Sequence, residues 1–268
     1  PASPIIFVGI SNVGVNMINL ATGKKLSTLT STNQTNIALS HNGQYVILHS
    51  ERYPYIWDTQ KKESIQTINS ECQQNFIWSP TNNQFACTHS RMIEIWNAMS
   101  GKQISSIRTT TPVTLFRYAP DGNKALYIAR SGRAITVVEL ERGEPISTLR
   151  DRRHVFLDAV YLPDSRRILS ANNHGRLQLW DIHTRRMLLN IAARGQAYFN
   201  KVAVSSDGFY AASLSKDNSI LLWDLRNGKL VKEFRGHSDD INHISFIDNN
   251  KKLLSGGHDN MVRIWKLP

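Results

Sequence analysis

The chain has 268 residues, of which 41% are hydrophobic and 20% are charged, and this composition excludes a disordered or fibrous protein. Its apolar runs last only a few residues, so none reaches the roughly 20 residues that a membrane-spanning helix needs. The formal net charge of +11 indicates a surface that attracts anions such as phosphopeptides, nucleic acid or acidic membranes.

One strand pattern recurs along the chain, in which apolar and polar residues alternate and the last residues include an aromatic followed by an acid or amide. An alternation with a period of two is typical of β-strands. In chain order the copies are VNMINL ending at Leu20, YIWD at 55–58, IEIWN at 93–97, ITVVEL at 135–140, LQLWDI at 177–182, ILLWDL at 220–225 and VRIWKL at 262–267.

The spacing of these copies is nearly constant. Successive equivalent positions are 39 to 43 residues apart, at Ile18, Trp57, Trp96, Val138, Trp180, Trp223 and Trp265. The blades of β-propellers repeat about every 40 to 45 residues. The sequence therefore predicts an all-β fold, a seven-bladed β-propeller of four-stranded antiparallel blades.

Turn-forming residues fall where four-stranded meanders need connections. One series joins first to second strands and begins at His41, Ser79, Pro120, Pro163, Ser206 and Ile247. A second series joins third to fourth strands and places a glycine after Thr22, Ser100, Arg142 and Asn227. Glycine suits such hairpins because it adopts positive φ angles without a steric cost.

Over essentially its whole length the chain resembles the WD-repeat β-propellers, because Trp57-Asp58, Trp180-Asp181 and Trp223-Asp224 supply the Trp-Asp pair of that family. The last repeat carries the fullest signature, with His237, Ser255, Asp259 and Trp265 at the positions of the family's buried tetrad. The resemblance implies that these side chains form one hydrogen-bonded chain with a structural role. It also implies a rigid ring that binds other macromolecules.

The other repeats match the tetrad only in part. The sixth keeps Ser213, Asp217 and Trp223, and the fifth keeps Ser170 and Trp180 with His174 at the position of the aspartate. Repeats one to four have lost most of the tetrad, so we expect those blades to depend more on apolar packing.

We predict no enzyme, cofactor or metal site. The chain contains no HExxH, paired CxxC or GxSxG motif. His237, His243 and His258 lie near Asp259 in sequence, but a structural role fits them better than metal binding. Cys72 falls in a predicted loop and Cys87 in a predicted strand, so we expect no disulfide framework and a cytoplasmic location, with the nucleus as an alternative.

We expect one propeller domain over residues 1–268, with blades at about 1–30, 31–70, 71–109, 110–151, 152–193, 194–235 and 236–268. The first and last blades are incomplete, because residues 5–10 read as a second strand and Trp265 lies in a third strand. At the repeat length of a propeller blade, about 20 further residues before Pro1 would supply the missing strands. We therefore expect this to be the C-terminal part of a longer protein.

Cations concentrate in the connections that gather on one face of a propeller of this family, the top face. These residues are Arg91, Arg130, Arg133, Arg176 and Lys216 at second-to-third turns, and Arg108, Arg150, Arg152, Arg153, Arg194 and Arg235 in loops between blades. An arginine guanidinium binds phosphate or carboxylate with two parallel hydrogen bonds. The opposite face is also basic, at Lys24, Lys25, Lys61, Lys62, Arg166, Arg167, Arg185, Arg186, Lys251 and Lys252, so an undirected basic surface is an alternative.

We predict a non-catalytic scaffold or substrate-recognition module that binds a protein partner, an acidic or phosphorylated segment, on the top face. One alternative is a propeller that binds RNA or DNA, which the charge favours and the scarcity of aromatic residues in the top-face turns does not. Another alternative is a regulatory sensor domain of a larger signalling protein or enzyme.

Overall fold

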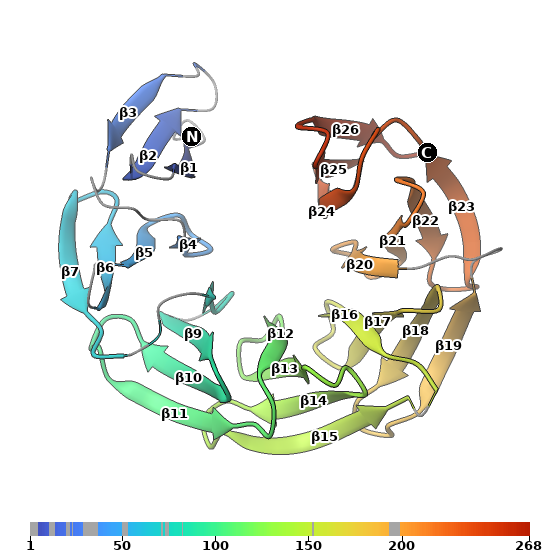
Figure 1. Cartoon of the computed structure of the whole chain (residues 1–268), viewed down its shortest axis with the longest axis horizontal. Helices are drawn as coiled ribbons and strands as arrows, with labels where there is room; N and C mark the ends of the chain where they lie inside the picture. Colours follow the sequence, from blue (N-terminus) through green and yellow to red (C-terminus); the bar gives the residue numbers. More distant parts are fainter. Residues whose placement is uncertain are drawn as a thin grey trace. The chain divides into compact units, whose positions relative to one another are not determined.

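The computed structural model describes residues 5–10, 14–19, 22, 24–28, 37–49, 53–70, 72, 75–81, 83–151, 153–192 and 199–268. These residues form 26 strands and no helix, so none of them belongs to a helix that could span a membrane. The strands make up seven antiparallel sheets, in each of which successive strands are hydrogen-bonded neighbours (Figure 1). The all-β, propeller-type fold class predicted from the alternating pattern is confirmed.

The chain divides into two compact units. The first comprises Pro1–Val113 with Glu141–Gly143. Its sheets are β1 (Ile5–Ile10), β2 (Gly14–Asn19) and β3 (Lys25–Thr28); β4 (Ala38–Leu39), β5 (Tyr45–His49), β6 (Pro54–Asp58) and β7 (Glu63–Thr67); and β8 (Phe76–Trp78), β9 (Gln84–His89), β10 (Met92–Asn97) and β11 (Gln103–Arg108).

The second unit comprises Thr114–Leu140 with Glu144–Pro268. Its sheets are β12 (Val113–Tyr118), β13 (Lys124–Ala129), β14 (Ala134–Glu139) and β15 (Glu144–Arg150); β16 (Phe156–Tyr161), β17 (Arg167–Asn172), β18 (Arg176–Asp181) and β19 (Met187–Ala192); β20 (Phe199–Val204), β21 (Tyr210–Ser215), β22 (Ile220–Asp224) and β23 (Lys229–Phe234); and β24 (Ile241–Ile247), β25 (Lys252–Gly257) and β26 (Val262–Lys266).

The seven equivalent positions found in the sequence lie in β2, β6, β10, β14, β18, β22 and β26. In the first six of these strands, the pairing with the following strand shifts register immediately before that position, for example between Leu179 and Trp180 and between Leu222 and Trp223. A bulge inserts one extra residue and increases the local twist of the strand. The β-bulge therefore recurs at the same position of the repeat as the tryptophan or the aliphatic residue that takes its place.

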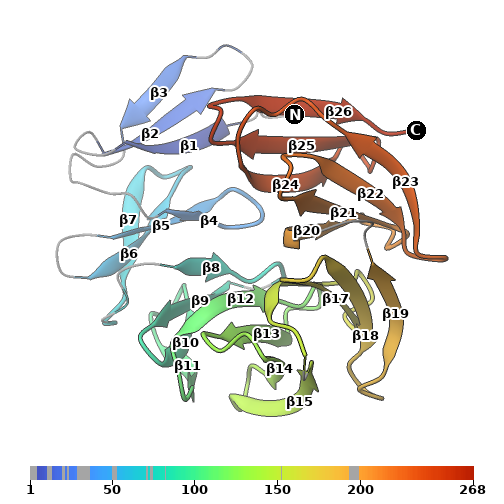
Figure 2. The same cartoon turned by 45° about the vertical axis from the view of Figure 1, so that its right-hand side comes forward.

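The core of the second unit lies between successive sheets, which face one another (Figure 2). Leu126, Ile135 and Val137 of one sheet pack with Phe156 and Trp180 of the next. Each fully buried aliphatic or aromatic side chain contributes on the order of 1.5 to 3 kcal/mol relative to an exposed one. In β14, alternate residues such as Ile135 and Val137 are buried in this core, which explains the period of two in the sequence of that strand.

The core of the first unit is built in the same way. Ile47 and Ile56 pack with Phe85 and Trp96 from the following sheet. The indole nitrogen of Trp78 donates a hydrogen bond to the Ala38 carbonyl oxygen over 2.8 Å, which links β8 to β4. Neighbouring sheets within this unit are therefore joined by one buried polar contact as well as by apolar packing.

Candidate functional site

The sheet β24–β26 contains a buried chain of hydrogen bonds. The Trp265 indole nitrogen donates to Ser255 Oγ over 2.8 Å, and Ser255 Oγ lies 2.8 Å from His237 Nε2. His237 Nδ1 lies 2.8 Å from Asp259 Oδ2, and the His237 side chain is 0% exposed. Because the serine oxygen accepts from Trp265, its own hydrogen is free for Nε2, and Nδ1 then carries the proton that is donated to Asp259. The geometry thus brings together the four residues of the predicted tetrad.

Asp259 is the end point of this chain. Burial alone would raise the pKa of its carboxyl group, but hydrogen bonds from His237 and from the backbone N–H groups of Met261 and Ser238 lower it. The folded state therefore favours the ionised carboxylate, which accepts all of these bonds.

The fifth and sixth repeats keep only part of this chain. The Trp180 indole donates to Ser170 Oγ over 3.0 Å, and the Trp223 indole donates to Ser213 Oγ over 2.9 Å. The prediction that His174 stands in for the tetrad aspartate is wrong, because its ring is in an exposed turn beside Asn173 and His154.

Asp217 also takes no part in the network of the sixth repeat. Its carboxylate accepts hydrogen bonds from Ser219 and pairs with Arg235 over 2.8 Å. Since the sequence offers no histidine at the position of His237 in that repeat, nothing would connect the carboxylate to Ser213.

The acid of the Trp-Asp pair has a role that the sequence reasoning missed. Asp181 Oδ1 accepts hydrogen bonds from the backbone N–H groups of His183 and Thr184, and Asp58 Oδ1 accepts them from Gln60 and Lys61. These bonds hold the turn from the third to the fourth strand in each sheet. Asx-type turns of this kind explain why an acid or amide follows the aromatic residue.

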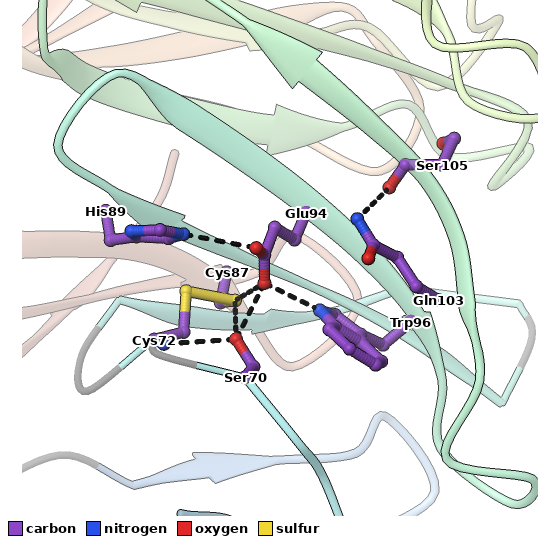
Figure 3. The surroundings of a disulfide bond; sticks show 8 residues. All are labelled: Ser70, Cys72, Cys87, His89, Glu94, Trp96, Gln103 and Ser105. Carbon is purple, nitrogen blue, oxygen red and sulfur yellow. Dashed lines mark hydrogen bonds and ion pairs between the residues drawn. A yellow bond between two sulfur atoms is a disulfide. The ribbon is translucent and has the colours of Figure 1, made fainter.

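The third repeat has a polar network of its own (Figure 3). The Trp96 indole donates to Glu94 Oε2 over 3.0 Å, and Ser70 Oγ donates to the same oxygen over 2.6 Å. Glu94 lies two residues before Trp96 in β10, so both side chains share one face of the strand. In this repeat Glu94 replaces the missing serine as the partner of the indole, in addition to the apolar packing around Phe85 and Trp96.

Cys72 and Cys87 form a disulfide beside this network, with their Cα atoms 6.2 Å apart. The expectation of no disulfide is therefore wrong. Cys72 lies in the connection between β7 and β8, and Cys87 lies in β9, where it pairs with Phe76 across the sheet. The disulfide therefore joins a loop residue to a strand residue of the same sheet.

Hydrogen bonds join three connections in the second unit: the β13–β14 turn, the β15–β16 loop and the β17–β18 turn. Phe156 N donates to the Gly132 carbonyl oxygen over 2.7 Å, and Asn173 N donates to the Val155 carbonyl oxygen over 3.1 Å. Gly132 has a φ of 63°, and a Cβ atom there would lie 2.3 Å from Val155 Cγ1. Glycine is needed for both reasons, since the loop approaches the turn closely.

Five of the predicted partner-binding residues belong to these three connections or to the strand ends next to them. We call this group the arginine patch; it comprises Arg130, Arg133, Arg150, Arg153 and Arg176. Arg150 pairs with Ala134 at the edge of the sheet, next to Arg133. The side chains are exposed, apart from a partly buried Arg176 that lies 3.5 Å from Asn190 Oδ1.

One carboxylate, that of Asp151, lies in the β15–β16 loop beside the patch. It accepts hydrogen bonds from the backbone N–H groups of Arg153 and His154 and from Gln178 Nε2, and its Oδ2 lies 2.8 Å from the ring Nδ1 of His154. Burial would raise the pKa of Asp151, but these hydrogen bonds lower it. Within the described part of the chain, no carboxylate forms an ion pair with the arginines of the patch.

The remaining predicted partner-binding residues lie elsewhere. Arg91 and Arg108 are exposed at one end of the sheet β8–β11, in the first unit. Lys216 is exposed in the β21–β22 turn of the second unit. Arg152 and Arg194 lie outside the described residues.

Three basic residues predicted for the opposite ends of the sheets are neutralised by ion pairs. Arg166 pairs with Asp181 over 2.7 Å, Arg167 with Asp164 over 2.6 Å, and Lys252 with Asp248 over 2.9 Å. Arg235, predicted for the top face, is likewise paired, with Asp217 over 2.8 Å. Among the described residues of the sheet β16–β19 and its connections, Arg166 and Arg167 have carboxylate partners, whereas Arg153 and Arg176 have none.

Comparison with known proteins agrees with this repeat structure. The family model for the WD domain, G-beta repeat, matches residues 193–224 and 228–266. The part of the chain from residue 193 to residue 266 therefore carries WD repeats. The two matched segments contain the indole–serine pair of Trp223 and the complete chain from Trp265 to Asp259.

Relatives of this WD-repeat chain come from plants and animals. It is 26% identical over 182 residues to Autophagy-related protein 16 of Arabidopsis thaliana, which covers 68% of this chain and 35% of that protein. It is 33% identical over 119 residues to Transducin-like enhancer protein 2 of Mus musculus, covering 44% of this chain and 15% of that protein. It is 33% identical over 127 residues to Protein groucho of Drosophila melanogaster, covering 46% and 17%. The matches thus span about a third or less of each relative.

The second unit also contains a groove that sequence reasoning missed, with a volume of about 650 Å³. Its walls come from β16, β20 and β24 and include Lys201 and His243. Arg117 lies in it and pairs with the buried Asp158 over 3.2 Å. Burial lowers the pKa of His243, and the charges of Arg117 and Lys201 lower it further. The first strand of each sheet in this unit contributes a polar side chain to the groove. A polar residue of this kind does not stand out from the alternation of apolar and polar residues in the sequence.

Proposed function

We propose that this chain is a protein-binding module whose arginine patch binds an acidic or phosphorylated segment of a partner. The observation that carries the proposal is the position of five arginines in or beside three connections that hydrogen bonds join, with no ion pair to a carboxylate within the described residues. The module binds and does not catalyse, and residence in the cytoplasm is part of the same proposal.

The chemistry of the patch supports an anionic ligand. A guanidinium presents several N–H donors in one plane, so that it binds two oxygens of a phosphate or carboxylate at once. A phosphorylated residue carries about −1.5 to −2 charges and can accept one to three such bonds from an arginine cluster. Among the described residues, no carboxylate is paired with the patch arginines, so no such ion pair has to break before a ligand binds.

The WD repeats support a macromolecular partner. Repeat folds of this type present rigid strands and variable connections, and the connections of the patch are tied to one another by hydrogen bonds. A preorganised surface loses less conformational entropy on binding, which favours affinity.

Fluorescence anisotropy with two labelled probes tests the proposal. One probe is an acidic peptide that contains phosphoserine, and the other is a single-stranded RNA oligonucleotide. We expect the peptide to bind the chain, and Arg133→Glu with Arg153→Glu to weaken its binding by about tenfold or more, equivalent to about 1.4 kcal/mol. The RNA should bind more weakly than the peptide.

The matched control is Arg185→Glu with Arg186→Glu, which makes the same change of charge in an exposed turn between β18 and β19. We expect little effect from this pair. If both pairs weaken binding equally, the proposal of a defined site fails and an undirected basic surface replaces it. If RNA binds more tightly than the peptide and responds to the patch variants, the ligand is a nucleic acid.

A further inference from the structure

The disulfide of the third repeat is surrounded by metal-ligating side chains (Figure 3). Ligand atoms of Cys72, His89 and Glu94 all lie within 4.8 Å of one another. Cys87 Sγ is bonded to Cys72 and lies 3.8 Å from Glu94 Oε2. Two sulfurs, one imidazole and one carboxylate therefore meet at one point, contributed by β9, β10 and the connection before β8.

His89 faces Glu94 within this group. Its Nε2 atom is shielded from solvent and lies 3.3 Å from Glu94 Oε1, although the side chain is 23% exposed. A neutral imidazole binds metals through such a nitrogen. His89 Nε2 and Glu94 Oε1 are therefore placed side by side as two ligand atoms for one metal ion.

Glu94 is held in place by groups outside the cluster. Ser70 Oγ and the Trp96 indole nitrogen both donate to its Oε2 atom, over 2.6 Å and 3.0 Å. These bonds leave Oε1 directed at His89. Hydrogen bonds that orient a ligating side chain in this way are typical of metal sites.

We propose that, once the disulfide is reduced, Cys72, Cys87, His89 and Glu94 bind one zinc ion. A dithiol reductant donates two electrons and two protons to the disulfide, which becomes two thiols while the reductant forms its own disulfide. Zinc then displaces the two thiol protons and is bound by two thiolates, His89 Nε2 and the Glu94 carboxylate.

The choice of metal follows from the ligands. Thiolate and imidazole ligands favour zinc, which is four-coordinate and tetrahedral in structural sites. With bonds of about 2.3 Å to sulfur and about 2.0 to 2.2 Å to nitrogen or oxygen, the ligand atoms of such a site lie roughly 3.3 to 3.8 Å apart. The distances from Glu94 to His89 Nε2, 3.3 Å, and to Cys87 Sγ, 3.8 Å, already lie in this range, and Cys72 Sγ lies within 4.8 Å of its His89 and Glu94 partners.

The disulfide-bonded form and the zinc-bound form would have the same structural effect. In each of them Cys72 and Cys87, which are fully buried, link the connection before β8 to β9. The third repeat would therefore keep its connection in place in oxidising and in reducing surroundings. This site is distinct from the arginine patch, which lies in the other unit.

The test uses the intact chain, which is reduced with a phosphine and then freed of the reductant under anaerobic conditions. We expect it to bind one equivalent of zinc in competition with a chromophoric chelator, whereas the oxidised chain binds none at this site. Cobalt(II) in place of zinc should give a tetrahedral spectrum with a thiolate-to-metal charge-transfer band. Absence of zinc binding by the reduced chain, or a cobalt spectrum without thiolate bands, would overturn the proposal.

Variants of the two non-sulfur ligands identify the site. His89→Ala and Glu94→Gln should each weaken zinc binding by more than about tenfold. Loss of a side chain that only orients a metal ligand already weakens binding by about 10- to 100-fold, so loss of a ligand itself should weaken it at least as much. His183→Ala is the matched control, since His183 is exposed in the β18–β19 turn of the other unit. Thermal melting of the oxidised variants shows whether they fold. If folded His89→Ala binds zinc as the parent chain does, the assignment is wrong.

Discussion

At the scale of single residues, the same motif position is used in different ways in successive repeats. The Trp265 indole ends a chain of four residues, the Trp180 indole has a serine alone, and the Trp96 indole donates to Glu94. The indole nitrogen of Trp57 is shielded from solvent and has no hydrogen-bond partner among the described residues. The ring is buried at Trp96, Trp180 and Trp223 and partly buried at Trp57 and Trp265, and the hydrogen bond to its nitrogen varies.

Ser255→Ala tests the energetic role of the complete chain. Ser255 is fully buried and contacts both Trp265 and His237 through its hydroxyl group. Removing that group leaves two buried nitrogens unpaired, so we expect the free energy of unfolding to fall by about 1 to 3 kcal/mol. Urea denaturation measures the change.

The control for this variant is Ser238→Ala, at an exposed neighbour of His237. Exposed substitutions of this kind usually change stability by less than about 0.5 kcal/mol. Equal stability of the two variants would show that the network contributes nothing measurable.

At the scale of elements, the turns decide how each sheet closes. The acid after the tryptophan caps the turn to the fourth strand, and the bulge before the tryptophan sets the twist of the same hairpin. The hydrogen bond from the Thr184 N–H is the main reason that the pKa of Asp181 is lowered to about 2 from its ordinary value of 3.8. Burial opposes this shift, and Arg166 adds to it. These contacts require the charged carboxylate.

The stability of the second unit should therefore depend on acid pH through Asp181. Because its pKa is lower in the folded than in the unfolded chain, the contribution is complete above pH 3.8 and is lost as the pH falls towards about 2. We expect the melting temperature to fall over this range, and to fall less steeply in Asp181→Asn. Circular dichroism melts at several pH values measure it.

Glu144→Gln is the control for the acid titration, since Glu144 is exposed in β15. Its curve should follow that of the parent chain. An Asp181→Asn curve with the parent slope would mean that other groups account for the acid sensitivity.

At the scale of the whole chain, the net charge of +11 is distributed unevenly. Arg166, Arg167 and Lys252 have carboxylate partners, whereas the arginine patch has none among the described residues. Unpaired cations that lie close together create a local positive potential, which speeds the approach of an anionic ligand. This distribution favours a directed anion site over general solubility.

Binding of the phosphoserine peptide should accordingly weaken as salt rises. Screening acts over about 10 Å at 0.1 M salt and about 3 Å at 1 M, so the attraction between exposed charges shrinks across that range. We expect the dissociation constant to rise with potassium chloride, with a shallower slope for Arg133→Glu with Arg153→Glu. Anisotropy titrations at several salt concentrations measure both slopes, and identical slopes would argue against the patch.

Periodic features of this chain were open to prediction from sequence. The alternation of apolar and polar residues indicated the strands, the spacing of Trp57, Trp96, Trp180, Trp223 and Trp265 indicated the repeat, and the turn residues marked the connections. Each of these signals is local or recurs at fixed intervals. The residues of the last tetrad could be named because a full copy of the family pattern is present.

Contacts that depend on how connections fold over the sheets were decided only by the tertiary structure. The sequence does not reveal that Cys72 reaches Cys87, that Glu94 replaces a serine as the partner of Trp96, or that His174 turns away from Ser170. Nor does it reveal which arginines lack carboxylate partners. The physical reason is that hydrogen bonds and ion pairs depend on distances of a few ångströms between segments far apart in sequence, which no periodic pattern encodes.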